Sequence, residues 1–208
     1  MRTKKEIDGG PTSAEKSGVF QKRRTQIIKK AAKLFAKKGY AQTSMREISK
    51  ATGIDLSNLY YFIESKEEIL FRVFEMIHRP ESSVFENKAI MALEDPAEQL
   101  RAVIREMMHF SFRYKDEVLL LYRESKQLPK KLLKEILARE SGFIRQIEAI
   151  LRKGLEKKAF AMEDPAFTAG MIAYELSLFP LRSWNLKHFS KEELIQRVES
   201  HIMGAILA

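Results

Sequence analysis

Apolar residues recur along this chain every three to four positions, which is the period of an α-helix, and the pattern continues to the last residues. No segment shows the two-residue alternation, bounded by turn residues, that is typical of a strand. We therefore expect an all-α protein of about nine to ten helices. The expected helical ranges are 21–38, 45–52, a short helix after Gly53 that ends near 62, 65–79, a short run ending near 93, 96–114, 117–127, 129–158, a helix from 165 and a helix from 190.

Two short helices around Gly53 form the most informative unit. Gly53 follows the first helix, 45–52, at the position where a helix end commonly needs positive φ. After the turn, Ile54, Leu59 and Phe62 can pack back against Ile48, because residues three to four apart share a helix face. Two helices that cross at a steep angle are typical of a helix-turn-helix.

A capping box marks the end of this unit. Ser65-Lys66-Glu67-Glu68 has serine at the N-cap and glutamate three residues later, directly before a further apolar run. The second short helix is therefore expected to end near Phe62.

The formal charge of the chain is concentrated at its N-terminal end. The net charge is +9, and residues 1–40 contain 12 Lys/Arg against 3 Asp/Glu, which leaves 25 of each type in residues 41–208. Attraction to phosphates and counterion release both require local cations. A polyanion, either nucleic acid or an anionic membrane, is therefore the expected partner of the helix pair.

Composition limits the remaining possibilities. The 208 residues are 45% hydrophobic and include no cysteine, so we expect one sizeable core or two small ones and no disulfide or thiol chemistry. The polar residues 1–20 do not resemble a signal peptide and are expected to form a disordered basic arm. No apolar stretch approaches the roughly 18 residues of a membrane span. We expect a soluble, cytoplasmic protein without a membrane partner.

Catalytic and metal-binding motifs are not found in the sequence. It contains no HExxH, no phosphate loop and no GxGxxG, and the four histidines are scattered along the chain. We expect no catalytic residue, no metal and no cofactor. Two alternatives remain open: an enzyme whose site combines distant Glu and Arg residues, and a membrane-surface protein that uses the basic arm and the amphipathic helix 21–38.

One family matches the residues themselves. The segment 26–70 resembles the DNA-binding domain of the tetracycline-repressor (TetR/AcrR) regulators, through IIKKAAKLFAKKGYAQTSMREISKATGI at 27–54 and LYYFIESKEEIL at 59–70. Where that family usually has an aromatic residue followed by Phe-Pro-Ser-Lys, this chain has Phe62-Ile63-Glu64-Ser65-Lys66. The resemblance implies a three-helix helix-turn-helix domain at 21–66 and a larger helical domain at 67–208 that binds an effector and forms a homodimer.

Candidate DNA contacts follow from the helix pair. Asn58 is the best candidate for reading an adenine edge, because an amide both donates and accepts hydrogen bonds. The segment that would enter the DNA groove contains no Arg or Lys, so Arg46 is the nearest residue that could read guanine. Backbone contacts are expected from hydroxyl groups, N–H groups and charges at helix starts. The full candidate set is Lys22, Arg23, Arg24, Thr43, Ser44, Arg46, Ser57, Asn58, Tyr60, Tyr61 and Lys66.

A segment rich in methionine and aromatic residues is the candidate effector site. Deformable Met side chains and large aromatic rings suit an apolar pocket, although plain core packing is the simpler explanation of any one of them. Nearby arginines could meet an anionic head group. The candidate residues are Met107, Met108, Phe110, Phe112, Tyr114, Leu121, Tyr122, Ser125, Arg145, Phe179, Arg182 and Trp184.

The region 118–158 also resembles the effector domain of fatty-acid and acyl-CoA responsive members of the family. A fatty acyl-CoA is therefore one expected effector. The alternative is a regulator of a drug-efflux gene that responds to cationic or hydrophobic drugs.

The helix from Pro165 has two apolar stripes, one bulky and one of small residues, so we expect both faces to be buried. One face would meet its own domain and the other a second subunit, unless both are buried within one chain. Pro180 should kink the helix near 177–179. Trp184 could then form one wall of the pocket, although a bent core helix explains these residues equally well. The bulky stripe comprises Phe167, Met171, Tyr174, Leu178 and Leu181, and the small stripe comprises Ala166, Ala169, Gly170, Ala173 and Ser177.

These expectations combine into one mechanism. A homodimer binds a pseudo-palindromic DNA operator, blocks transcription and is released when a small apolar or amphipathic effector enters the C-terminal domain. The helix 65–79 joins the two domains, so its tilt would change the spacing of the two DNA-reading helices.

Overall fold

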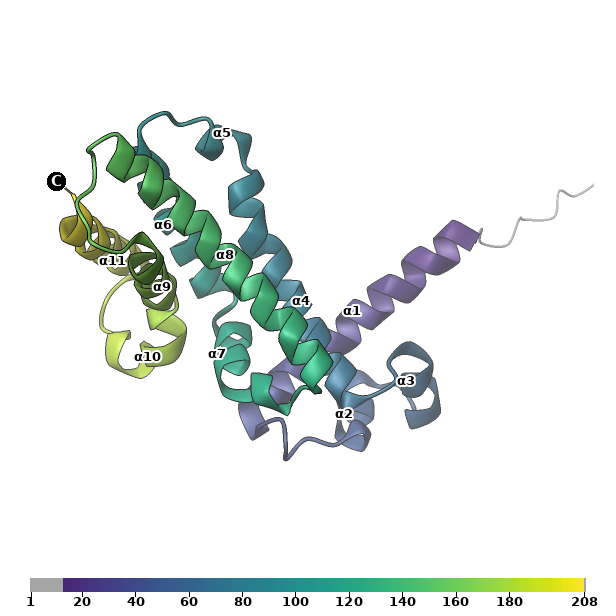
Figure 1. Ribbon diagram of the computed structural model, residues 1–208. Coiled ribbons are helices and arrows are strands. Elements are labelled where there is room, and N and C mark those ends of the chain that lie inside the picture. The colour runs from purple at the N-terminus through teal and green to yellow at the C-terminus, as the bar shows by residue number, and fades with distance from the viewer. Residues whose placement is uncertain (1–12, 208) are drawn as a thin grey trace, which may run out of the picture. The chain divides into compact units, whose positions relative to one another are not determined.

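The computed structural model describes residues 13–207, and within them side chains are described except at 13–17 and 79–82. The described residues form α-helices and short 3-10 turns, with one isolated antiparallel bridge between Phe160 and Leu207, so the predicted all-α class is confirmed (Figure 1). The elements are α1 (Ser13–Lys38), α2 (Met45–Thr52), α3 (Leu56–Phe62), α4 (Lys66–Ser83), η1 (Val84–Glu86), α5 (Lys88–Met91), α6 (Pro96–Arg113), α7 (Lys115–Glu124), η2 (Ser125–Gln127), α8 (Lys130–Glu156), α9 (Pro165–Leu176), α10 (Leu178–Leu186) and α11 (Lys191–Ile206).

The chain divides into two compact units, Met1–Ile69 and Leu70–Ala208. The division falls inside α4, three residues after the boundary predicted at 66/67. The predicted disordered arm is wrong for residues 13–20, which form the first turns of α1. Ala14, Glu15 and Lys16 are good helix formers, and the Gly-Gly-Pro stretch that suggested disorder lies before them. The rest of the predicted arm lies outside the described residues.

The core of the first unit lies between α1, α2 and α3. Phe35 of α1, Ile48 of α2 and Leu59 of α3 are each at most 1% exposed. Burial of such a side chain contributes roughly 1.5–3 kcal/mol, which is enough to hold helices as short as α2 and α3 in place. Without this contact, helices of that length would be unstable in water.

Capping groups set the ends of α2. Ser44 and Glu47 form a capping box, in which each side chain bonds the backbone of the other residue. Gly53 ends the helix at φ 70°, as predicted, and its N–H donates to the Ser49 carbonyl at 3.0 Å. The Ser49 hydroxyl donates across the turn to the Ile54 carbonyl at 2.6 Å. The turn between α2 and α3 is therefore fixed on both sides of Gly53.

The residues predicted to form a capping box at the start of α4 form only half of it. The Glu68 N–H donates to the Ser65 hydroxyl at 3.1 Å, as in a capping box. The Glu68 carboxylate accepts a bond from the Glu64 N–H at 2.8 Å. The helix therefore begins at Lys66, and α3 ends at Phe62 as predicted.

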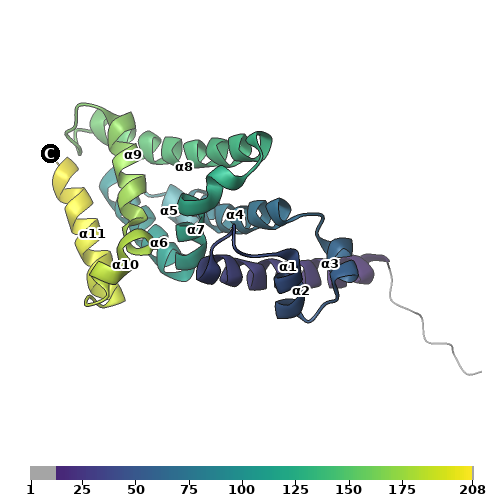
Figure 2. The ribbon, with the colours of Figure 1, turned by 90° about the horizontal axis from the view of Figure 1, so that it is seen from below.

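The second unit is built around α6. Its residues Leu100, Val103, Ile104, Met107 and Met108 are at most 3% exposed, and they belong to one apolar core with residues of α8, α9 and α11. α9 packs against α8, and α9 and α11 lie at the same end of this unit (Figure 2). The core therefore ties together helices that are far apart in the sequence.

An ion-pair cluster joins α6 to α11. The Glu199 carboxylate, which is buried, accepts hydrogen bonds from Arg105 at 2.6 and 2.9 Å and from Arg101 at 3.0 Å. The Arg105 hydrogen bonds are the main reason that the pKa of Glu199 is lowered, and the bond from Arg101 adds to the effect. The carboxylate is therefore held in its charged form.

Gly154 allows the chain to close over the end of α8. A Cβ at this position would lie 1.9 Å from the Phe160 ring, so only glycine fits. Phe160 is 3% exposed, and the next residue, Ala161, donates its N–H to the Ile206 carbonyl at 2.8 Å. The segment after α8 is thereby fixed to the end of α11.

Two prolines have different effects on the helices. The helix predicted to end at Arg79 continues through Pro80 to Ser83. Where a kink was predicted near 177–179, the helical run is divided: α9 ends at Leu176, and α10 starts at Leu178 with Pro180 in its first turn. No helix in the described part of the chain is long and apolar enough to cross a bilayer.

Candidate functional site

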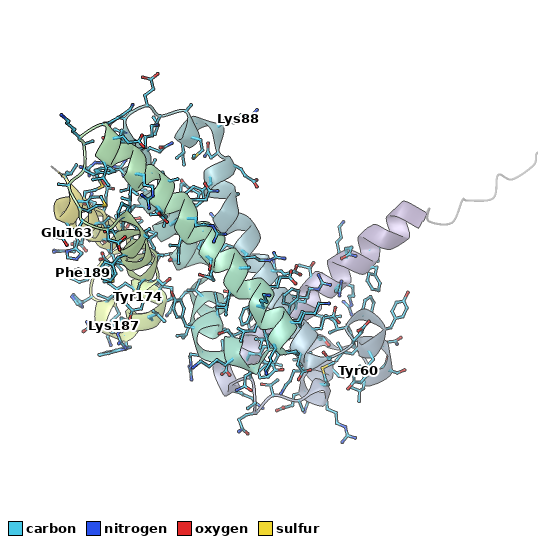
Figure 3. The ribbon with its side chains drawn as sticks, in the orientation of Figure 1. Tyr60, Lys88, Glu163, Tyr174, Lys187 and Phe189 are labelled. Atoms are coloured by element: carbon cyan, nitrogen blue, oxygen red, sulfur yellow. The ribbon has the colours of Figure 1, made fainter. Side chains whose placement is uncertain are left out.

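α3 presents a row of exposed polar and aromatic side chains. Four of its side chains are exposed: Ser57, Asn58, Tyr60 and Tyr61. Tyr61, at 71%, is more exposed than Tyr60, at 48%. Leu59, between them, is fully buried and fixes the helix to the rest of the unit. Figure 3 shows Tyr60 on this helix. The four residues predicted to contact DNA from this helix are therefore on its outer surface.

Asp55 controls the amide of Asn58. As the N-cap of α3, Asp55 accepts the Asn58 N–H at 2.9 Å with one oxygen and the Asn58 side-chain amide at 2.5 Å with the other. These bonds lower the pKa of Asp55. A carboxylate only accepts hydrogen bonds, so the amide must turn its nitrogen toward Asp55. The carbonyl oxygen and one N–H of Asn58 remain for another partner.

The residues before and at the start of α2 differ in availability. Thr43 is 1% exposed, its hydroxyl donates to the Gly39 carbonyl at 2.9 Å, and its N–H donates to the Tyr40 carbonyl at 3.1 Å. Both donors of Thr43 are therefore used within the unit, so the predicted phosphate contact does not fit its position. Ser44 and Arg46 are exposed.

Lys38 neutralises the charge of Glu47 in the first turn of α2. Its carboxylate pairs with Lys38 and bonds the backbone and hydroxyl of Ser44. The Lys38 hydrogen bond is the largest cause that lowers the pKa of Glu47 to about 2, followed by the bonds from Ser44. Glu47 therefore stays ionised, and its pairing with Lys38 reduces repulsion of a nearby phosphate.

Lys66 lies against the loop between α1 and α2. Its ammonium donates to the carbonyls of Tyr40 and Thr43, both at 3.0 Å, and lies 4.2 Å from the centre of the Tyr40 ring. The predicted phosphate contact would have to use its third N–H. Lys66 therefore has a structural role that its position in the sequence did not reveal.

The basic residues of α1 also separate into two groups. Lys22 and Arg23 are exposed, as a DNA contact requires. Arg24 is part-buried and pairs with Glu68. The predicted DNA contact of Arg24 therefore competes with an ion pair inside the unit.

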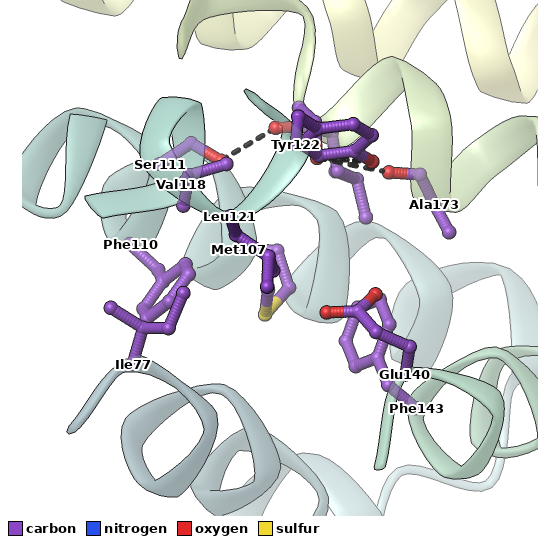
Figure 4. A pocket seen from close by; sticks show the side chains of 12 residues that line it. Ile77, Met107, Phe110, Ser111, Val118, Leu121, Tyr122, Glu140, Phe143 and Ala173 are labelled. Carbon is purple, nitrogen blue, oxygen red and sulfur yellow. Dashed lines mark hydrogen bonds between the residues drawn. The ribbon is translucent and has the colours of Figure 1, made fainter. Parts of the chain in front are cut away.

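A small cavity lies inside the second unit, bordered by α4, α6, α7, α8 and α9 (Figure 4). Its volume is about 30 Å³, close to the space of one water molecule. A drug-sized ligand needs roughly 300–1,000 Å³, so binding requires the wall to move. The cavity is lined by Ile77, Met107, Phe110, Ser111, Val118, Leu121, Tyr122, Glu140, Phe143, Ala173, Leu176 and Ser177.

Only part of the predicted effector set reaches this cavity. Met107, Phe110, Leu121 and Tyr122 line it. Of the others, Met108 is buried in the core, and the rings of Phe112 and Phe179 stack with their centroids 4.0 Å apart. Tyr114 borders a neighbouring groove. Ser125 begins η2, and Arg145 is exposed on α8. Arg182 and Trp184 are exposed, so the prediction that Trp184 walls the pocket is wrong. Trp184 follows Arg182, which departs from helical geometry at φ −129° and ψ 23°, and its indole lies on the surface.

Hydroxyl groups and one carboxylate make the cavity wall partly polar. The Ser111 hydroxyl donates to the Leu176 carbonyl at 2.5 Å, and the Tyr122 hydroxyl donates to Ser177 at 3.3 Å. Glu140 of α8 also faces the cavity, with one carboxylate oxygen 3.7 Å from Nε2 of His78. The wall can therefore accept hydrogen bonds as well as contact apolar groups.

Two open grooves adjoin the cavity. One, of about 150 Å³, shares Met107 and Phe110 with it, and the other, of about 720 Å³, shares Phe143. Each of these shared side chains therefore borders both the cavity and a groove. If they rotate, the cavity and a groove would become one larger site.

The bulky stripe of α9 is exposed. Phe167, Met171 and Tyr174 are 69%, 45% and 48% exposed, and Tyr174 is visible on this helix in Figure 3. Of the small stripe, Ala169 is fully buried, whereas Ala166 is exposed and Gly170, Ala173 and Ser177 are partly buried. The sequence left open whether both stripes are buried within one chain. That alternative is therefore wrong.

Sequence reasoning missed several residues of both sites. Asp55 was missed because an aspartate before a helix is usually read as a cap and nothing more. Glu140, Phe143 and Leu176 were missed because the cavity gathers residues from five helices, and no local motif predicts that meeting. No cluster of His, Asp or Glu in the described residues could hold a metal ion.

Two family models match the chain. The model of bacterial regulatory proteins of the tetR family matches residues 27–73, and the model of the tetracyclin repressor-like C-terminal domain matches residues 93–176. The first match contains α2 and α3, and the second contains most of the helices around the cavity. Together the two matches cover more than half of the chain.

Curated relatives have similar descriptions. The chain is 26% identical over 177 residues to the HTH-type transcriptional regulator HbdR of Aromatoleum sp. (strain CIB), covering 83% of this chain and 72% of that protein. It is 28% identical over 141 residues to the fatty acid metabolism regulator protein of Bacillus subtilis (strain 168), covering 63% and 67%. The match to the probable HTH-type transcriptional regulator YttP of the same organism covers 55% of that protein. The match to the HTH-type transcriptional repressor NicS of Pseudomonas putida covers 48% of that protein, so the chain spans about half the length of these two relatives.

Solved structures share the fold. The TetR family regulator PfmR of Thermus thermophilus aligns with a TM-score of 0.74 at 23% identity, over 85% of this chain and 94% of that chain. AibR, in complex with isovaleryl coenzyme A and operator DNA, aligns with a TM-score of 0.75 at 22% identity, over 86% and 97%. At these identities the likeness establishes the fold alone.

Proposed function

Because this chain belongs to the tetR family of bacterial regulatory proteins, we propose that it is a ligand-responsive transcriptional repressor. It binds a pseudo-palindromic operator as a homodimer in the cytoplasm, and a small apolar or amphipathic effector releases it. The family consists of transcriptional regulators, which disfavours the enzyme alternative.

The exposed face of α3 is the observation on which the DNA-binding proposal depends. Asn58 offers an acceptor and a donor together, the pair that reads adenine, and Ser57 and the two tyrosines extend the contact. Affinity comes from cations outside α3, with Lys22, Arg23 and Arg46 exposed for phosphates.

The exposed stripe of α9 supports the homodimer proposal. An exposed patch of large apolar residues is costly in water unless another molecule covers it. A two-fold related copy would cover it with the same stripe, since a symmetric interface is self-complementary. Two α3 helices in such a dimer would read half-sites about 34–36 Å apart or a multiple of that spacing.

Two effector classes are candidates for a site that forms when the cavity opens. Relatives named for fatty acid metabolism or bound to isovaleryl coenzyme A favour an acyl-CoA, whose acyl chain would enter among Met107, Phe110 and Leu121. The carboxylate of Glu140 in the wall favours the second candidate, a cationic or hydrophobic drug. In either case the ligand must open the cavity, and it would release DNA by favouring a different position of α4, which contributes Ile77 to the wall.

DNA binding can be tested with a random duplex library. The chain is expected to enrich a two-fold symmetric sequence and to bind it at least roughly 1,000-fold more tightly than a scrambled duplex. Selection without symmetry would contradict the homodimer on a palindrome. Equal binding of both duplexes would contradict operator recognition.

The effector can be tested by thermal shift and by DNA release with matched C12 compounds. Lauroyl coenzyme A, laurate, dodecanol and dodecylamine share one chain and differ in head group. A bound compound at 100 times its dissociation constant should add about 2.7 kcal/mol of stability and displace the selected duplex. Response to the first two compounds supports the acyl-CoA candidate, and response to dodecylamine supports the cationic one. If none of them acts, both candidates are rejected.

A further inference from the structure

Phe20 joins the N-terminal part of α1 to α3. Its ring centroid lies 5.0 Å from that of Phe62 and 5.6 Å from that of Tyr61, with the Tyr61 ring edge-on at 88°. Tyr61 and Phe62 are themselves 5.3 Å apart at 78°. The three rings form an aromatic cluster whose distances lie in the range of favourable ring pairs. The cluster fixes the outer turn of α3 against α1.

Tyr61 remains exposed within this cluster. Its side chain is 71% exposed although two rings contact it, whereas an aromatic residue that served only the core would be buried. A rigid, exposed tyrosine offers a ring face and a hydroxyl to another molecule at little cost in side-chain entropy. The arrangement therefore suits contact with a partner outside the chain.

The same turns of α1 contain exposed cations. Lys22 and Arg23 follow Phe20 by two and three residues, and both are exposed. This segment precedes residue 27, where the match to the DNA-binding family model begins. Its contacts are therefore a property of this chain that the family match does not supply.

We propose that residues 18–24 extend the DNA-contact surface of α3, with Phe20 as the residue that positions Tyr61. Lys22 and Arg23 bind backbone phosphates beside the bases that α3 reads. Phe20 itself touches no DNA and acts through the ring of Tyr61. This inference rests on the proposed DNA binding.

A double-mutant cycle separates positioning from simple stabilisation. The duplex selected by the wild-type chain is the probe, and fluorescence anisotropy measures its affinity for the wild type, Phe20→Ala, Tyr61→Ala and the double variant. Phe20→Ala should weaken binding roughly 2- to 10-fold, the value of one aromatic pair. The double variant should bind within about 2-fold of Tyr61→Ala, because the role of Phe20 is lost with the ring it positions.

Three controls keep the result interpretable. Circular dichroism and thermal melts establish that each variant is folded at the temperature of the assay. Phe20→Tyr, which keeps a ring, should restore affinity. Phe20→Ala combined with Arg46→Ala should show multiplied effects, since Arg46 is outside the aromatic cluster.

Charge substitutions test the rest of the surface. Lys22→Gln and Arg23→Gln should each reduce the slope of log affinity against log salt by about one. Lys33→Gln, an exposed lysine further along α1, should leave the slope unchanged.

Four outcomes would overturn the inference. They are a folded Phe20→Ala variant with wild-type affinity, multiplied effects of Phe20→Ala and Tyr61→Ala, failure of Phe20→Tyr to restore affinity, and unchanged salt slopes for both cation variants. Each leaves operator binding by the wild type intact, so the proposed function would survive. A wild-type chain that selects no duplex would overturn the proposed function and this inference with it.

Discussion

At the scale of single residues, Asp55 and Asn58 lead to a prediction about sequence specificity. Asn58→Ala should reduce operator discrimination at one base position per half-site by roughly 1–3 kcal/mol and leave binding to a scrambled duplex unchanged. Asp55→Ser keeps an N-cap hydroxyl but removes the second oxygen, which bonds the Asn58 amide. It should relax specificity at the same position. The measurement is affinity for a panel of single-base variants of the selected duplex.

A different pattern would reject base reading by Asn58. If Asn58→Ala weakened all duplexes equally, its contact would be to the DNA backbone. If Asp55→Ser lowered the melting temperature without changing the base profile, Asp55 would be a cap alone.

The exposed residues of α3 were predictable from helix periodicity, and the polar residues around it were predictable only in part. Ser57 and Tyr61 lie roughly opposite Leu59 on the helix, and Asn58 lies about 100° from it, so their exposure follows from the spacing of one buried leucine. Thr43 and Lys66 are polar residues at helix starts, where the same groups can bind a phosphate or complete the hydrogen bonds of a loop. Sequence alone cannot distinguish these two uses, because the acceptors of Thr43 and Lys66 are backbone carbonyls.

At the scale of elements, Gly154 determines how α8 meets the segment that follows it. Gly154→Ala would push a methyl group into the Phe160 ring and should destabilise the chain by about 1–3 kcal/mol. Gly142→Ala, in the same helix, meets only Arg145 at 3.8 Å and should stabilise it by about 0.5–1 kcal/mol. Urea unfolding measures both values. Equal effects of the two substitutions would mean that the Phe160 contact is unimportant.

The ion pairs between α6 and α11 predict a dependence of stability on pH. The pKa of Glu199 is lower in the folded protein than the ordinary carboxyl pKa of 4.5. Its ion pairs therefore contribute fully to folding stability above pH 4.5, and this contribution is lost as the pH falls through the lower pKa of the folded state. The stability advantage of the wild type over Glu199→Gln should therefore shrink between about pH 5 and pH 3. Thermal melts of both proteins across that range measure it. A constant difference would show that Glu199 contributes through packing rather than charge.

Most helix ends were predictable, and the cavity was not. Asp95-Pro96 and Asp164-Pro165 begin α6 and α9 as capping rules require, since aspartate accepts the first free N–H groups and proline needs none. The side chains around the cavity come from five helices whose packing depends on contacts distant in sequence. Met107 and Phe110 were therefore found by composition, whereas Glu140 and Phe143 looked like ordinary residues of an amphipathic helix.

At the scale of the whole molecule, the exposed stripe of α9 predicts an assembly. Met171→Glu should place a charge in the homodimer interface and convert the protein to monomers, with operator affinity falling more than roughly 10-fold. Leu137→Glu, at a 53% exposed apolar position on α8, is the matched control and should leave the dimer intact. Light scattering coupled to gel filtration measures the mass. A monomeric wild type, or a dimeric Met171→Glu variant, would contradict this interface.

The bond between Ala161 and Ile206 makes one amide a reporter for the end of the chain. The Ala161 N–H donates to the Ile206 carbonyl, which belongs to the last turn of α11, and this bond protects it from deuterium exchange. Helix ends open far more often than cores, so this amide should exchange at the rate at which that turn frays. Its protection, compared with that of amides in α6, would measure how tightly the C-terminal turn is closed without any substitution or label.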